Sequence, residues 1–202
     1  MAYPKLSSHF YRRSDTLAIA RELLGKHLVT SFEGVLTSGR IVETEAYLGT
    51  QDRACHAWNG SRTSRTETMY SIGGCAYVYI CYGIHHLFNI VTHTEGEPHA
   101  ILIRGIEPNE GIPIMLERRA KTVLKPNLTA GPGSLARALG IQTQHSGIDL
   151  QGEQIWIEDR NTNVSSGQIL ASSRVGVGYA GDDAFLPYRF RVTGSKWTSP
   201  AK

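Results

Sequence analysis

Two carboxylates and a phenol alternate along one predicted strand, and this stretch is the most informative part of the chain. The run from Gly39 to Gly49 reads GRIVETEAYLG. Because alternate side chains of a strand share a face, Glu43, Glu45 and Tyr47 point the same way. Such a face is either an ordinary solvated sheet surface or the wall of a polar pocket. Polar alternation alone leaves both interpretations open.

A second stretch, Tyr77 to Asn89, has the pattern of a hairpin rich in aromatic residues. The chain is expected to reverse near Tyr82 and Gly83, because glycine accepts the positive φ that tight reversals need. Counting by twos then puts Tyr77 and Tyr79 on one face and Tyr82 on the other, at the tip. Tyr79 is either a core residue or a pocket wall, whereas a large aromatic at a tight turn has little core to enter.

The polar loop between these strands contains a lone histidine, His56. In such a loop a histidine is more often a hydrogen-bonding residue than a catalyst. The spacing of the neighbouring cysteines and histidines matches neither C-x-x-C nor H-x-x-x-H, so we expect no metal site. The residues concerned are Cys55, His56, Cys75, Cys81, His85 and His86.

The stretch from residue 112 to residue 140 is the best candidate for a basic patch. Its five cations exceed its single acidic residue, Glu117, by four charges. They are Arg118, Arg119, Lys121, Lys125 and Arg137. Ordinary solvated helix faces also carry such charges. The turn before Ser134 would expose backbone N–H groups at a helix start, where a phosphate oxygen is favoured.

Most of the elements that must position these residues are predicted to be strands. Runs rich in Val, Ile, Thr and Tyr predict strands at 27–30, 40–47, 76–82, 84–91, 100–106, 154–158 and 188–192. Helices are predicted over 14–25, with Ser14 or Asp15 as the cap, over 111–121, and from the turn before Ser134 to residue 139. This order indicates an α+β fold with a curved, largely antiparallel sheet, a protruding β-hairpin and peripheral helices.

Length and composition indicate one domain over residues 1–202. With 41% hydrophobic and 19% charged residues, the chain is neither disordered nor collagenous. The formal net charge of +3 identifies no partner, although arginines, which bind carboxylates and phosphates bidentately, make up most of the 21 cations. Three cysteines and the absence of a signal or membrane-spanning pattern favour a cytoplasmic protein.

Four motifs together closely resemble the alkyladenine (3-methyladenine) DNA glycosylases of the mammalian and bacterial type. They are RIVETEAYLG at 40–49, YVYICYG at 77–83, LIRGIEP at 102–108 and RVGVGYAG at 174–181. The resemblance runs from about residue 10 to residue 197. It implies a base-excision repair enzyme with a fold related to a formyltransferase C-terminal domain. Such an enzyme flips alkylated or deaminated purines out of duplex DNA and hydrolyses the N-glycosidic bond.

The resemblance also implies the catalytic residues. Glu45 matches the general base that activates water for attack at C1′. Arg104 and the main chain at Val175 match the groups that help hold this water. Because no lysine occurs between Lys26 and Lys121, the matched strands offer no amine for a Schiff base. We therefore expect a monofunctional enzyme without lyase activity and without a cofactor.

The remaining matches concern the damaged base and the DNA. Tyr47, His56 and Tyr79 match the walls that sandwich the flipped base. Asn89 matches the position that rejects normal guanine, and Tyr82 matches the wedge inserted through the minor groove. The alternation of side chains along a strand agrees with this assignment, because it puts Glu45 and Tyr47 on the same face and puts Tyr79 and Tyr82 on opposite faces.

The expected partner is double-stranded DNA that contains damaged purines, bound by a monomer and not by a membrane protein. Two other functions are considered. A non-catalytic lesion-binding module of the same fold would not need Glu45 and Arg104. A small-molecule transferase would leave Tyr82 at the hairpin tip without a purpose.

Overall fold

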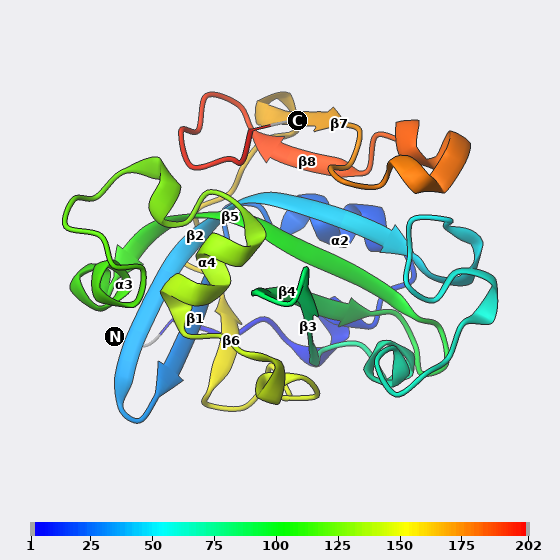
Figure 1. Ribbon diagram of the computed structural model, residues 1–202, viewed down its shortest axis with the longest axis horizontal. Helices are drawn as coiled ribbons and strands as arrows, with labels where there is room; N and C mark the ends of the chain where they lie inside the picture. The colour runs from blue at the N-terminus through cyan, green and yellow to red at the C-terminus, as the bar shows by residue number, and fades with distance from the viewer. Residues whose placement is uncertain (1–2, 201–202) are drawn as a thin grey trace.

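The computed structural model describes residues 3–200 and is built around one curved antiparallel sheet (Figure 1). Strand order is β3-β4-β5-β2-β1-β6, and β8 pairs with both β2 and β7. The strands are β1 (His27–Phe32), β2 (Val35–Leu48), β3 (Ala76–Cys81), β4 (His85–Thr92), β5 (His99–Glu110), β6 (Ile155–Glu158), β7 (Ile169–Ser172) and β8 (Arg189–Val192). The predicted α+β class and the largely antiparallel sheet are confirmed.

Short helices pack around this sheet. The α-helices are α1 (Ser8–Tyr11), α2 (Thr16–Glu22), α3 (Ile112–Arg118) and α4 (Pro132–Leu139). The 3₁₀ helices are η1 (Gly49–Gln51), η2 (Trp58–Gly60), η3 (Glu67–Tyr70), η4 (Pro126–Leu128), η5 (Thr143–His145), η6 (Ser166–Gln168) and η7 (Gly178–Phe185). Helix α2 packs against β2 and β5, and α4 packs against β4 and β5 (Figure 1). Their apolar faces close the hydrophobic core.

The long strands β2 and β5 lie at the centre of the sheet, and their middle residues belong to the candidate active site. One edge of β2 pairs with β5. Its other edge pairs first with β1 and then, from Glu43 to Glu45, with β8. The pairing with β5 shifts register on both sides of Glu43, which marks a β-bulge. Around Glu43 both edges of β2 are therefore paired, and the side chains of Glu43 and Glu45 are buried.

The ends of the predicted helices differ from the structure by a few residues. The helix predicted over 14–25 spans only α2, and Asp15 is its cap, with Oδ1 accepting a hydrogen bond from the Ala18 N–H at 2.9 Å. The helix predicted over 111–121 shortens to α3. Helix α4 begins at Pro132 and ends where Gly140 adopts a left-handed φ of +76°.

Strand boundaries show larger differences. Strand β2 begins five residues before the predicted start, because a turn at Glu33 and Gly34, both with positive φ, joins it to β1 in a hairpin. Strand β7 was missed. Its four residues pair with β8 alone, so tertiary contact forms it more than local pattern does.

Candidate active site

A cleft of about 540 Å³ opens between the end of β2, the β3–β4 hairpin and the start of α4. Most of the residues singled out in the sequence line it. They are Tyr47, His56, Tyr79, Tyr82, Asn89, Arg104, Ser134 and Val175. The chain thus brings together five segments that lie far apart in sequence. Of the catalytic candidates, Glu45 lies just beneath this lining.

The carboxylate of Glu45 is fully buried, with 0% of the residue exposed. Oxygen Oε1 accepts a hydrogen bond from the Val175 N–H at 2.8 Å. Oxygen Oε2 accepts one from the Tyr47 hydroxyl at 2.8 Å and one from Arg104 Nη1 at 3.3 Å. The solvated-face interpretation of this strand is therefore wrong, because Glu43 and Glu45 are both shielded from water.

Burial and hydrogen bonding act on Glu45 in opposite directions. Burial raises the pKa of the Glu45 carboxyl above its usual 4.5. The Arg104 cation, the Val175 N–H and the Tyr47 hydroxyl oppose that rise, because each stabilises the charged form. The result is a carboxylate with a raised pKa directly under the floor of a cleft.

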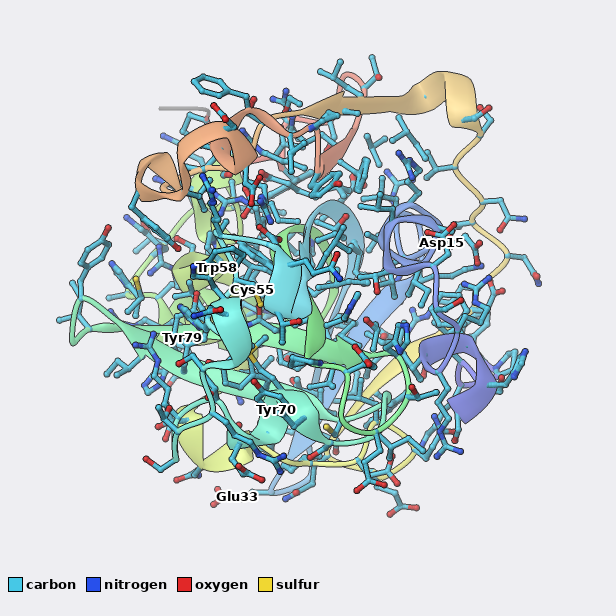
Figure 2. The ribbon with its side chains drawn as sticks, turned by 90° about the vertical axis from the view of Figure 1, so that its right-hand side faces the viewer. Asp15, Glu33, Cys55, Trp58, Tyr70 and Tyr79 are labelled. Atoms are coloured by element: carbon cyan, nitrogen blue, oxygen red, sulfur yellow. The ribbon has the colours of Figure 1, made fainter. Side chains whose placement is uncertain are left out.

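Aromatic side chains form the walls of the cleft above this carboxylate. The rings of His56 and Tyr79 meet edge to face, with centroids 4.6 Å apart and planes at 77°. The Nδ1 atom of His56 lies 3.0 Å from the Tyr77 hydroxyl, which joins the loop to β3. Figure 2 shows Tyr79 beside the loop that carries Cys55 and Trp58. Tyr47 packs against the same apolar cluster, so all three predicted walls meet in one place.

Charge and hydrogen bonding also determine the protonation of His56 and the orientation of the Asn89 amide. Burial, reinforced by the neighbouring Arg65 cation, lowers the pKa of His56 to about 4, so the ring is neutral near pH 7. Asn89 is buried in β4, and its Nδ2 donates to the main-chain oxygens of Tyr77 at 3.2 Å and Leu87 at 3.3 Å. These bonds fix the orientation of the amide at the cleft wall.

Tyr82 projects from the tip of the β3–β4 hairpin. It has a φ of +51° and is followed by Gly83 at +71°, so the chain reverses where the sequence predicted. Tyr82 is 87% exposed, and Ile84 beside it is 72% exposed. Figure 2 shows this hairpin extending away from the body of the protein. Two large apolar side chains in water at one tip indicate a contact surface and not a packing role.

The comparisons with known proteins agree with this arrangement. The family "Methylpurine-DNA glycosylase (MPG)" matches residues 9–196. A relative from Chlamydia pneumoniae named "Putative 3-methyladenine DNA glycosylase" is 44% identical over 93% of this chain and 95% of its own. Relatives with the same name from Chlamydia felis and Clostridium acetobutylicum are 46% identical over 92% of this chain and 94% of theirs, and 43% identical over 98% of both.

The chain belongs to the methylpurine-DNA glycosylase family. It is a DNA N-glycosylase, an enzyme of base-excision repair, and the resemblance inferred from its motifs is confirmed. In the part of the chain that the structure describes, no helix is long and apolar enough to cross a membrane. Within residues 3–200, no three metal-binding side chains cluster closely enough to hold a metal ion.

The arginines of the predicted basic patch in this glycosylase are largely engaged by its own main chain. Arg118 Nη1 donates to the Ala138 oxygen, and Arg137 Nε donates to the Arg118 oxygen. Arg119 Nη2 donates to the Asn127 oxygen and to Ser134 Oγ at 3.1 Å. These bonds tie α3, η4 and α4 together. The other two cations of the patch, Lys121 and Lys125, lie exposed in the loop after α3.

Sequence reasoning missed a buried ion pair behind the pocket. Arg174 forms a bidentate salt bridge with Asp52, in which Nη2 and Oδ1 are 2.8 Å apart. Its guanidinium also lies 4.8 Å from the centre of the Tyr47 ring. Because Arg174 directly precedes Val175, this pair holds the Val175 N–H against Glu45. In the sequence, Arg174 could have been singled out because it is the first residue of the RVGVGYAG motif.

We expect His56→Gln to make the free energy of unfolding less dependent on pH between about 6.5 and 4. The folded protein keeps this ring neutral down to about pH 4, whereas the unfolded chain protonates it near 6.5. Lowering the pH through this window therefore favours unfolding, by at most about 1.4 kcal/mol per pH unit, and glutamine removes that contribution. Urea unfolding of both proteins across the window measures the difference. Identical pH slopes would contradict it.

Proposed function

We propose that this glycosylase excises alkylated or deaminated purines from duplex DNA by direct hydrolysis, with Glu45 as the general base. The observation that carries the proposal is the Glu45 carboxylate, held by Arg104 and the Val175 N–H directly under an aromatic cleft. A base stacked between Tyr47 and the His56–Tyr79 pair would place its sugar near this carboxylate. Stacking of that kind contributes about 1–3 kcal/mol per base.

The chemical step follows from these groups. Glu45 takes a proton from a water molecule as the water oxygen attacks C1′ and the bond from C1′ to the purine nitrogen breaks. The bonding electrons leave with the base, and the sugar passes through an oxocarbenium-like state that a nearby carboxylate stabilises. Arg104, which lines the cleft, has N–H donors left to orient that water. A base that already carries a positive charge leaves as a neutral molecule, whereas a neutral base such as hypoxanthine leaves as an anion that takes a proton from water.

The enzyme is proposed to be monofunctional. Direct hydrolysis needs no covalent bond to the sugar, whereas a lyase reaction begins with an amine attacking C1′. Among the described residues that line the cleft, none is a lysine. The glycosylase would therefore stop at an abasic site and leave the DNA backbone intact.

Access to the base requires it to leave the helix, and Tyr82 is the proposed wedge. Its exposed ring at the hairpin tip would fill the gap that the flipped nucleotide leaves and offset an unstacking cost of a few kcal/mol. Asn89, with its amide fixed by main-chain oxygens, is the proposed filter against the exocyclic amine of guanine. Backbone phosphates would be held by the exposed Lys121 and Lys125 and by Ser134 at the start of α4.

Glu45→Gln is expected to reduce excision by about 10²–10⁴-fold, because the amide keeps the shape of the carboxylate but cannot take a proton. Binding to the lesion duplex should persist. The measurement is single-turnover release of hypoxanthine from a duplex with one such base, alongside a binding titration. Glu95→Gln, at an exposed position in the β4–β5 turn, is the matched control and should excise like the wild type. Glu45→Gln activity within tenfold of the wild type would refute the assigned base.

Tyr82→Ser should slow excision from duplex DNA about tenfold, and from a single strand much less, because only the duplex must be opened. The ratio of the two single-turnover rates reports the wedge. Leu170→Ser removes a half-exposed apolar side chain on β7, outside the cleft, and should leave the ratio unchanged. Equal losses on duplex and single-stranded substrates in Tyr82→Ser would remove the wedge role.

A further inference from the structure

The guanidinium of Arg104 is held by three separate groups. Nitrogen Nη1 donates to Glu45 Oε2 at 3.3 Å, and Nε donates to Glu43 Oε1 at 3.1 Å. Nitrogen Nη2 donates to the hydroxyl Oγ of Ser199 at 3.1 Å. Because the guanidinium is planar, partners on all three nitrogens fix both its position and its rotation. The partner of Nη2 lies 95 residues further along the chain.

Glu43 connects these groups to a second buried arginine. Its Oε1 accepts from Arg189 Nε at 2.7 Å and from Ser199 Oγ at 2.8 Å, in addition to Arg104. Its Oε2 accepts from the Ser199 N–H. With Glu45, the cluster holds two carboxylates and two guanidinium groups, all nearly inaccessible to water. A buried ionic cluster is seldom more stable than apolar packing of the same volume, so its distinctive property is the orientation it imposes.

The end of the chain is anchored so that Ser199 reaches this cluster. Trp197 is buried in the core, and its main-chain oxygen lies against Gly105, the residue after Arg104. A Cβ at position 105 would lie 2.6 Å from that oxygen, so only glycine allows the approach. The Ser199 oxygen in turn accepts a hydrogen bond from Arg189 Nη2 at 2.7 Å. Figure 1 shows the C-terminal segment lying next to β8, the strand that carries Arg189.

We propose that Ser199 is a positioning residue of the glycosylase reaction: its hydroxyl, bridging Glu43 and Arg104, holds the Arg104 guanidinium against the carboxylate of Glu45. The proposal rests on the proposed role of Glu45 as the base. Ser199 is buried and does not line the cleft, so it acts through Arg104. The segment around Ser199 therefore supports the active site without lining it.

The side chain of Ser199 can be tested apart from its main chain. Ser199→Ala removes the Oγ bonds to Arg104, Glu43 and Arg189 and leaves the main-chain bonds to Glu43 and Arg189 in place. Thr198→Ala is the matched control, because among residues 3–200 the Thr198 hydroxyl bonds only to the Ser195 oxygen in the same segment. Single-turnover release of hypoxanthine is measured for both variants and the wild type at a series of pH values, together with thermal unfolding.

If the Arg104 guanidinium is held less firmly, both the rate of excision and its pH dependence should change. We expect Ser199→Ala to reduce the rate about tenfold, which corresponds to the loss of the one Oγ hydrogen bond that holds Arg104. The acid limb of the profile should move to higher pH, because Arg104 is the strongest group opposing the rise in the pKa of Glu45. The other groups facing Glu45 stay in place. They are Glu43 and Tyr47 on β2, Arg189 on β8, and Arg174 with the Val175 N–H from the loop after β7.

The outcomes separate this inference from the function on which it rests. A wild-type rate and acid limb in Ser199→Ala, with Glu45→Gln inactive, would overturn the inference alone. A lower rate with an unmoved acid limb and a large fall in melting temperature would also overturn it, since that pattern marks a structural residue. Activity in Glu45→Gln would instead overturn the proposed base. A tenfold loss with a shifted limb, absent from Thr198→Ala, supports the positioning role.

Discussion

The structure of the site depends on one electrostatic constraint: the Glu45 carboxylate is removed from water and must be compensated by fixed donors. A buried, uncompensated carboxylate is costly and would take up a proton. Here an arginine, a backbone N–H and a phenol, from three different segments, donate to its two oxygens. Each of these donors is itself fixed by a second group. The glycosylase thus keeps a carboxylate of raised pKa directly under the floor of a cleft.

The fold explains how these donors converge. Strand β2 carries Glu43, Glu45 and Tyr47, and β5 beside it carries Arg104. Strand β8 pairs with the other edge of β2 at the bulge, and the loop before it brings Arg174 and Val175 over the carboxylate. The sheet curves around this point, and the β3–β4 hairpin extends beyond it. The proposed base and the proposed wedge therefore belong to one continuous sheet.

Local sequence pattern predicted the parts of the site that depend on short-range geometry. The spacing of Glu45 and Tyr47 on one strand, and the separation of Tyr79 from Tyr82 at a glycine turn, follow from strand period and turn chemistry. The roles proposed for Arg104 and Val175 came from family resemblance, because nothing local in the sequence links them to Glu45. The partners Asp52, Arg189 and Ser199 escaped prediction, since their contacts span more than 90 residues. Charge counting likewise missed that Arg118, Arg119 and Arg137 bind main-chain oxygens.

The central claim is that burial dominates the environment of Glu45, and a direct titration tests it most simply. Carbon-13 NMR of protein labelled at its glutamate side-chain carboxyls, with the Glu45 signal assigned by its loss in Glu45→Gln, gives the pKa of this one group. The account predicts a midpoint above the usual 4.5, because desolvation outweighs the donors that surround the carboxylate. A midpoint at or below 4.5 would contradict it, and would mean that Arg104, Tyr47 and Val175 more than offset the loss of water.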